Sequence, residues 1–314
     1  MLPTRDGVSP SCVATPAGPW RLMLDFLAER IPGVGREGWQ TRMVAGDVLD
    51  AQGRPVPPDA PFAAHHKLHY WRALPFEHPI PFNEDIVFQD EHLVVADKPH
   101  FLPVTPAGRY VQQTLLVRLK KRLQIDTLVP IHRIDRETAG LVAFCVRPPD
   151  RHAYQGLFRE RAVHKVYEAL APVNPALSLP LLYRSRLTES ERFMAMQTVD
   201  GEPNAETLIE LIAQQGGLGH FRLSPVTGRK HQLRAQLHAL GMPICHDQIY
   251  PVLLPERPLD VAPDFSQPLQ LLARSLAFTD PVTGEQRAFH SQRSLHWPPD
   301  SSPAGHGLTH ADGA

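Results

Sequence analysis

The chain has 314 residues, of which 42% are hydrophobic, and a formal net charge of −1. This length suggests two globular units plus tails, and 33 prolines argue against an all-helical bundle. The total charge excludes a protein that is basic throughout, but the charged residues are unevenly distributed along the chain. Residues 109–136 hold seven Lys or Arg against two acids, whereas residues 73–97 hold six acids and neither Lys nor Arg.

The three cysteines, Cys12, Cys145 and Cys245, show no paired spacing, which predicts reduced thiols rather than a disulfide framework. No stretch has the apolar length of a signal-peptide core or of a membrane-spanning helix. We therefore expect a soluble cytoplasmic protein, a monomer that binds no membrane.

The first 73 residues predict a disordered start followed by a small module. Residues 1–18 are rich in Pro, Ser and Gly, and we expect them to be disordered. Apolar residues then recur at helical spacing from Trp20 to Ile31, and a second short helix is expected around Trp39. Strands are expected at 46–56 and 67–72, so residues 19–73 form a module with two helices and a few strands.

Residues 74–84 contain three prolines and predict a stiff linker. A hairpin is expected next, with strands at 86–88 and 92–96. Leucines at four-residue spacing predict a helix from Tyr110 to Gln124. The other faces of this helix carry Arg118, Lys120, Lys121 and Arg122. They form either an ordinary solvated surface or one that faces phosphates.

A polar segment at 130–140 runs through a glycine into the apolar residues Leu141–Val146, which predicts a loop that leads into a buried strand. Asp135 lies in this loop between Arg133 and Arg136. A carboxylate near guanidinium groups stays charged, and it could act as a nucleophile or base at a strand end. The alternative is a surface loop held by salt bridges.

The remaining elements complete a region that we expect to span residues 85–295. A strand is expected at 165–171, a long hairpin at 186–213, and a helix after the glycine turn at 225–228. A closing strand follows at 271–278. Residues 296–314 are polar and rich in Pro and Gly, and we expect a disordered tail.

Common catalytic motifs are missing. Asp135 with His231 and His238, or the run Cys245-His246-Asp247, could be imagined as metal ligands, but neither has a recognised ligand spacing. The chain has no Gly-x-Ser-x-Gly elbow, no phosphate loop and no second acid beside Asp135 that would suit a glycosidase. One carboxylate, several arginines and an aromatic residue would suit a reaction at the glycosidic carbon of a nucleotide.

Four segments in order resemble the motifs of RluA-type pseudouridine synthases. His132–Leu141 resembles His-Arg-Leu-Asp-x-x-Thr-Ser-Gly-Leu, and Val94–Pro99 is similar to the Asn-Lys-Pro strand and turn. Lys165–Ala169 resembles Lys-x-Tyr-x-Ala, and Thr227–Arg234 resembles Thr-Gly-Arg-Thr-His-Gln-Ile-Arg. The departures are Asp97, Ile134, Ala139, Lys230 and Leu233, all conservative or peripheral.

The resemblance covers about residues 84–290 and implies the family's α+β fold. This fold has a mixed, mainly antiparallel, bisected β-sheet with flanking helices. Residues 19–73 resemble, more weakly, the S4-like RNA-binding domain that many members carry. The implied reaction converts uridine to pseudouridine in 23S rRNA or tRNA, without a cofactor or metal, after the base is flipped out of the RNA.

By resemblance, Asp135 is the essential carboxylate, acting either at C1′ or by taking the 2′ proton. Arg234 matches the arginine that pairs with this aspartate, and Tyr167 matches the tyrosine that packs against the target base. Arg133 matches a residue that fills the gap left by the flipped uridine or contacts the backbone. Further expected RNA contacts are His132, Arg136, Lys165, Arg229, Lys230, Lys98, Arg118, Lys120 and Lys121.

Two other classes of function remain open from the sequence. One is an RNA-binding or ribosome-associated protein whose active site has decayed, although Asp135, Tyr167 and Arg234 are all present. The other is a nucleoside or RNA glycosidase, which would use the same flipped base but release it.

Overall fold

The computed structural model describes residues 2–191, 194–255 and 257–298. The chain divides into two compact units. The first unit contains Met1–Lys165, Pro255–Pro268 and Ala273–Gln292, and the second contains Val166–Leu254, Leu269–Leu272 and Arg293–Ala314. Along the chain this division falls at Lys165, and the linker expected at 74–84 stays a prediction.

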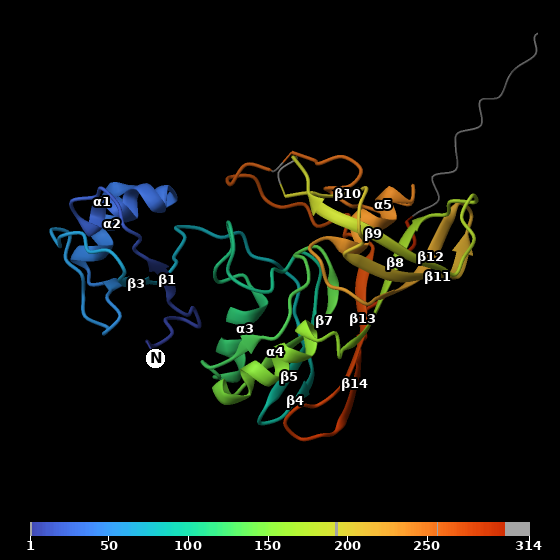
Figure 1. Ribbon diagram of the computed structural model, residues 1–314, viewed down its shortest axis with the longest axis horizontal. Helices are drawn as coiled ribbons and strands as arrows, with labels where there is room; N and C mark the ends of the chain where they lie inside the picture. The colour runs from blue at the N-terminus through green and yellow to red at the C-terminus, as the bar shows by residue number, and fades with distance from the viewer. Residues whose placement is uncertain (1, 192–193, 256, 299–314) are drawn as a thin grey trace, which may run out of the picture. The chain divides into compact units, whose positions relative to one another are not determined.

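The N-terminal part of the first unit is a small module with a core of its own (Figure 1). Phe26, Leu27 and Trp39 are fully buried in this core. The three strands pair in the order β1-β3-β2. The elements are β1 (Ser11–Ala14), α1 (Met23–Arg30), the 3₁₀ helix η1 (Pro32–Val34), α2 (Arg36–Val44), β2 (Val48–Leu49) and β3 (Lys67–Tyr70).

The expectation that residues 1–18 are disordered is wrong for Ser11–Ala14. This segment pairs antiparallel with β3, from Ser11 opposite Tyr70 to Ala14 opposite Lys67. Val13 packs against the core of the module. Composition could not predict this strand, because its hydrogen-bond partner lies more than 50 residues away.

The rest of the first unit is built on strands in the order β13-β7-β5-β4, of which β7-β5 and β5-β4 pair antiparallel. β14 pairs with β13, and β6 pairs with β7. The elements are β4 (Asp85–Gln89), β5 (Leu93–Lys98), α3 (Leu115–Leu123), β6 (Val129–Pro130), β7 (Ala139–Cys145), the 3₁₀ helix η2 (Pro148–Asp150), α4 (Arg151–Arg159), β13 (Leu271–Thr279) and β14 (Gln286–His290).

Helices α3 and α4 cover opposite faces of these strands, because side chains alternate along a strand. Val94 and Val142 pack with Leu115 and Leu119 of α3. Their sequence neighbours in β5 and β7 pack with Tyr154 of α4 on the other side. β7 is therefore buried on both faces, as its continuous apolar sequence predicts.

Helix α3 begins at Leu115 and not at Tyr110 as the leucine spacing predicted. The carboxylate of Glu77 accepts the backbone N–H groups of Val111, Gln112 and Gln113 at 2.9 to 3.0 Å. Thr114 then caps the helix by accepting the N–H of Val117. The first expected turn of the helix is thus a loop held by a distant acid.

The second unit is also mainly antiparallel, with strands in the order β10-β9-β11-β12-β8 and, among its described residues, the helix α5. Its elements are β8 (His164–Pro172), β9 (Leu181–Glu189), β10 (Met196–Val199), β11 (Ala205–Gln215), β12 (Leu218–Pro225) and α5 (Gln232–Ala239). Leu233 and Leu237 of α5 pack against Phe221 and Leu223 of β12. The predicted α+β class with a mainly antiparallel sheet is confirmed.

In the described ranges, no helix has both the length and the apolar character needed to cross a membrane. Most of the tail expected to be disordered, residues 299–314, lies outside the described residues. Within the part that is described, His296 donates its backbone N–H to Gln270 Oε1 at 2.9 Å.

Candidate active site

Asp135 lies in the loop between β6 and β7, and His132 fixes the start of this loop. The backbone N–H of Ala143 in β7 donates to His132 Nε2 at 3.1 Å, and the backbone N–H of Ile131 donates to the carbonyl of Ala143 at 3.0 Å. The imidazole stacks on Phe158 of α4 with ring centroids 4.5 Å apart. His132 thus supplies the acceptor that a strand partner would otherwise provide.

The hydrogen bond to Ala143 also determines the protonation state of His132. Because Nε2 accepts, the proton of the neutral ring is on Nδ1. Burial, together with the nearby charge of Lys165, lowers the pKa of His132 to about 3. His132 was predicted to contact RNA, but its contacts within the first unit make it a neutral anchor of the Asp135 loop.

Two side chains from the end of β5 and the turn after it hold the other side of the loop. Lys98 Nζ donates to the carbonyl oxygens of Pro99 at 2.9 Å and Arg136 at 3.0 Å. His100 Nδ1 donates to the carbonyl oxygen of Glu137 at 2.6 Å. The prediction that Lys98 contacts RNA is wrong, because the residue is fully buried.

The structure explains why a glycine, Gly140, follows the loop. Gly140 has φ of +107°, and an added Cβ would lie 2.3 Å from the carbonyl oxygen of Ala273 in β13. Any side chain here would force β7 and β13 apart. The glycine therefore sets the distance between the strand that follows Asp135 and its neighbour.

Among the arginines of the loop, Arg133 differs from Arg136. Arg133 is exposed and has no hydrogen bond or ion pair in the part of the chain that the structure describes. Arg136 is half-buried and bonds to Glu137 and Tyr110. Arg133 therefore has no partner for its guanidinium among the described residues, and its contact with RNA stays a prediction.

The basic residues of α3 separate into internal and exposed groups. Arg118 donates to the carbonyl oxygens of Ile80 and Phe82 at 2.7 Å each. Lys120 is 3% exposed, and its Nζ donates to Ser9 Oγ at 2.8 Å. Burial lowers the pKa of Lys120. The predicted phosphate contact is therefore wrong for the buried Lys120, whereas Arg118, which is partly exposed, and Lys121, which is exposed, stay predictions.

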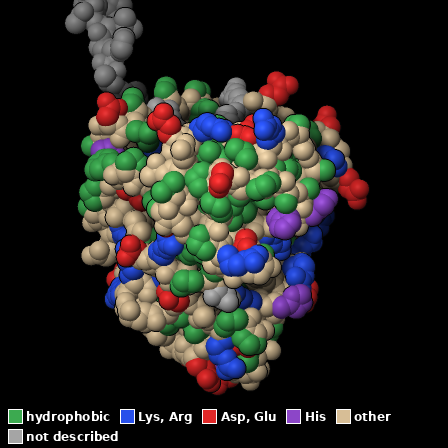
Figure 2. Space-filling model, turned by 90° about the vertical axis from the view of Figure 1, so that its left-hand side faces the viewer, with side chains coloured by type: hydrophobic (Ala, Val, Ile, Leu, Met, Phe, Trp, Pro, Cys, Tyr) green, Lys and Arg blue, Asp and Glu red, His purple; other side chains and the backbone are tan. Residues whose placement is uncertain are grey.

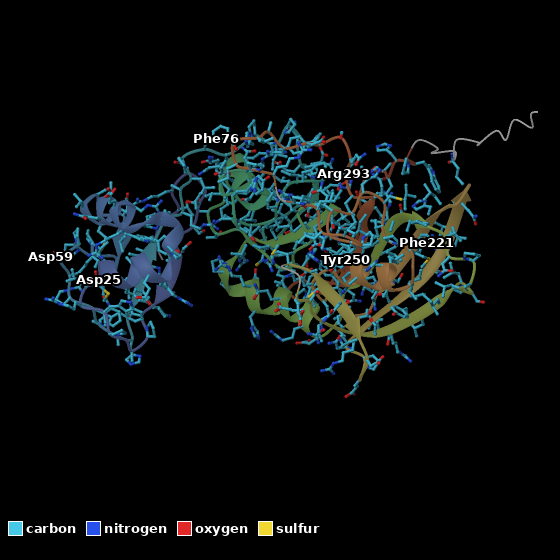
Figure 3. All side chains as sticks on the ribbon, turned by 90° about the horizontal axis from the view of Figure 1, so that it is seen from above. Asp25, Asp59, Phe76, Phe221, Tyr250 and Arg293 are labelled. Atoms are coloured by element: carbon cyan, nitrogen blue, oxygen red, sulfur yellow. The ribbon has the colours of Figure 1, made fainter. Side chains whose placement is uncertain are left out.

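In the second unit, Arg234 is buried on α5 and forms a bidentate ion pair with Asp247. This pair lies beside Tyr250, which Figure 3 labels. Nε and Oδ2 are 2.8 Å apart, and Nη2 and Oδ1 are 2.7 Å apart. Asp247 Oδ1 also accepts the N–H groups of Ile249 and Tyr250. The guanidinium lies over the ring of Tyr250, 5.6 Å from its centroid. This network fixes the orientation of Arg234 within its unit.

The glycine turn before α5 is held by Gln232. Its Oε1 accepts from Thr227 Oγ1 at 2.7 Å and from the backbone N–H of Arg229 at 3.0 Å. The side chains of Arg229 and Lys230 remain exposed beside this rigid turn. Both stay predicted RNA contacts.

Tyr167 and Lys165 come from β8, on either side of the division between the units. Tyr167 is half-buried and packs against the core of the second unit. Burial and the charge of Arg161 lower the pKa of Lys165. Because Asp135 belongs to the first unit, its pairing with Arg234 and its position relative to Tyr167 stay predictions.

Neither metal arrangement considered from the sequence is supported. Asp247 of the run Cys245-His246-Asp247 is occupied by Arg234. No group of three His, Cys, Asp or Glu residues that could hold a metal ion occurs in the described ranges.

The sequence model of the RNA pseudouridylate synthase family matches residues 92–239. An uncharacterized RNA pseudouridine synthase of Synechocystis sp. is 30% identical over 234 residues, which are 73% of this chain and 79% of that protein. The dual-specificity RNA pseudouridine synthase RluA of Haemophilus influenzae is 31% identical over 215 residues, 66% of this chain and 92% of the relative. The chain belongs to the RNA pseudouridine synthase family.

The solved structure of human RNA Pseudouridylate Synthase Domain Containing 4 has the same fold, with a TM-score of 0.52 and 26% identity. The similarity covers 67% of this chain and 88% of the human chain. The protein is accordingly an isomerase that converts uridine in RNA to pseudouridine, and its partner is RNA.

Two residues of this synthase were missed by the sequence analysis. Asp247, the partner of Arg234, was considered only as a metal ligand, although an arginine in an apolar helix calls for an acid. Tyr110, which bonds to Arg136, was predicted only to begin a helix. No short-range signal could have shown that it contacts a residue 26 positions away.

Proposed function

We propose that the pseudouridine synthase reaction takes place at Asp135, on a uridine flipped out of a loop or single strand of ribosomal or transfer RNA. Unpaired uridines are the favoured targets, because flipping a base costs least where it is not paired. Asp135 acts either at C1′ or on the 2′ proton. In either route the N1–C1′ bond breaks, the uracil turns, and C5 bonds to C1′ as Asp135 leaves C1′ or the 2′ proton returns. C5 then loses its proton and N1 gains one, so the product is an isomer of uridine.

The observation that supports this role for Asp135 is the support of its loop from both sides. His132 fixes the loop through a β7 amide, and Lys98 and His100 hold the carbonyl oxygens of the two residues that follow Asp135. A salt-bridge loop on the surface would have no need of a buried lysine. Such rigid support is what a catalytic carboxylate requires.

Other residues hold the flipped uridine and the RNA around it. Arg133 is free to fill the gap that the flipped uridine leaves. Tyr167 stacks on the target base, and stacking contributes about 1 to 3 kcal/mol per base. Arg234, which Asp247 orients, pairs with Asp135, while Arg229 and Lys230 contact phosphates.

Asp135→Asn tests the assignment. We expect the variant to fold and to bind RNA but to make no pseudouridine, because an amide is neither a nucleophile nor a base at this site. Chemical labelling of pseudouridine in the RNA and an unfolding curve measure the two properties. Asp59→Asn is the matched control, because Asp59 is exposed and has no ion pair in the described part of the chain.

Measurable turnover by Asp135→Asn would overturn the role of the carboxylate. A measurement of free uracil in the wild-type reaction distinguishes the proposal from a glycosidase. A pseudouridine synthase converts uridine without releasing free uracil. Free uracil in the wild-type reaction would be incompatible with the proposal.

A further inference from the structure

The residue after Asp135 is tied to a distant part of the fold. Arg136 Nη1 donates to the hydroxyl of Tyr110 at 2.9 Å, and its guanidinium carbon lies 5.4 Å from the centroid of the tyrosine ring. Arg136 Nε donates to Glu137 Oε1 at 2.7 Å. Both contacts hold the Arg136 side chain within the first unit, and its predicted contact with RNA stays a prediction.

Tyr110 is a rigid anchor for this arginine. It is 6% exposed and packs in the core with Leu115 of α3 and with Phe144 of β7. Its backbone N–H and carbonyl pair with those of Ala107, at 3.0 Å in both directions. Arg136 is thus held by a side chain that the core of the first unit fixes, and not by another mobile part of the loop.

The Ala107–Tyr110 turn is itself held from two sides. Arg72, which follows β3 of the N-terminal module, donates from Nη2 to the carbonyl oxygen of Gly108 at 2.9 Å. Arg109 donates to the carbonyl oxygen of Arg257 at 3.0 Å. The N-terminal module therefore contacts the same turn that carries the anchor of Arg136.

We propose that Tyr110 is a positioning residue for the isomerisation: through Arg136 it holds the backbone of the Asp135 loop so that the carboxylate points at the ribose. The proposal rests on the proposed function of Asp135. Tyr110 acts on the rate of the chemical step and not on RNA affinity, because its hydroxyl bonds to Arg136 and lies in the core. The contact of Arg72 with Gly108 makes the N-terminal module part of this support.

Tyr110→Phe removes the hydroxyl and keeps the ring, its packing and its contact with the guanidinium. Loss of a hydrogen bond to a charged group lowers the single-turnover rate of pseudouridine formation by about tenfold, while the Kd for RNA and the Tm stay unchanged. Tyr183→Phe is the control, since the Tyr183 hydroxyl has no hydrogen bond in the described part of the chain and its ring also packs on a core.

Arg136→Met provides the second arm of the test. If the two residues act through one bond, the variant carrying both changes is no slower than Arg136→Met alone. The proposal is overturned if Tyr110→Phe has an unchanged single-turnover rate or an effect only on the Kd for RNA. It is also overturned if the rate losses of Tyr110→Phe and Arg136→Met multiply in the double variant. Asp135→Asn is assayed in parallel: an active Asp135→Asn overturns the proposed function, whereas an inactive one beside a normal Tyr110→Phe overturns only the role of Tyr110.

Discussion

At the scale of single residues, the surroundings of Asp135 depend on side chains that look like surface groups in the sequence. His132 accepts a backbone N–H of β7, and Lys98 is buried beneath the loop. Asp97, which differs from the asparagine usual in the family, is 1% exposed and accepts from Ser291 Oγ and the backbone N–H of Gln292. This departure is therefore part of the internal support of β5 and not peripheral.

The low pKa of His132 predicts a pH dependence of stability. The ring is neutral in the folded protein down to about pH 3 but charges near pH 6.5 in the unfolded chain. The unfolded state thus binds more protons below pH 6.5, and the free energy of unfolding falls as the pH falls from there, by up to about 1.4 kcal/mol per pH unit.

Denaturant unfolding of wild type and His132→Gln across this pH range measures the effect. Glutamine keeps an acceptor for the Ala143 N–H but does not titrate, so its stability should fall less steeply on acidification. His92 contributes to the pH dependence of stability with the opposite sign, because its hydrogen bond to Asp150 raises its pKa. This contribution is the same in the wild type and in His132→Gln. Equal slopes in the two proteins would contradict a neutral His132.

At the scale of elements, helix α3 shows that neighbouring basic residues of one segment can be buried in the fold or exposed to solvent. Its leucines pack on the sheet, as their spacing predicted. Its lysines divide, however: Lys120 points to Ser9 and is buried, whereas Lys121 is exposed. Val8 of the N-terminal segment packs beside Val117 on the same helix. The segment before β1 therefore covers a face of α3 that looks solvated in the sequence.

Charge reversal at the two lysines should have different effects. Lys120→Glu places a carboxylate in a buried site that already has Asp126 nearby, and we expect a loss of about 3 kcal/mol in the free energy of unfolding. Lys121→Glu should leave stability within about 0.5 kcal/mol and lower the salt dependence of RNA binding by about one phosphate contact. Urea unfolding and RNA titrations at several salt concentrations measure both. A stable Lys120→Glu would show that the contact with Ser9 is dispensable.

At the scale of the whole molecule, charge does not identify the partner. The net charge is −1, and the face that Figure 2 shows carries basic and acidic side chains interspersed with apolar ones. We propose that RNA affinity comes from local groups such as Arg133, Arg229 and Lys230. An S4-like role for the N-terminal module stays a prediction. Family membership gives the reaction, but it leaves the target uridine open.

Pseudouridine maps of cells with and without this gene identify the substrate. We expect one or a few sites in ribosomal or transfer RNA to be lost, each in a loop or an unpaired strand, because such bases flip at the least cost. Complementation with Asp135→Asn should restore none of them. Sites lost only within long uninterrupted duplexes would contradict the proposed mode of access.

The sequence by itself determined the order of most elements, the buried strand behind Asp135 and the family motifs, because these depend on local periodicity and on side chains close together in the chain. It also predicted the glycine turn before α5, which Gln232 closes within a few residues. Only the tertiary structure decided that Lys98 and Lys120 are internal, that Asp247 orients Arg234, and that Tyr110 holds Arg136. These facts depend on contacts between residues distant in the chain, and burial determines whether a charged side chain faces RNA or supports the fold.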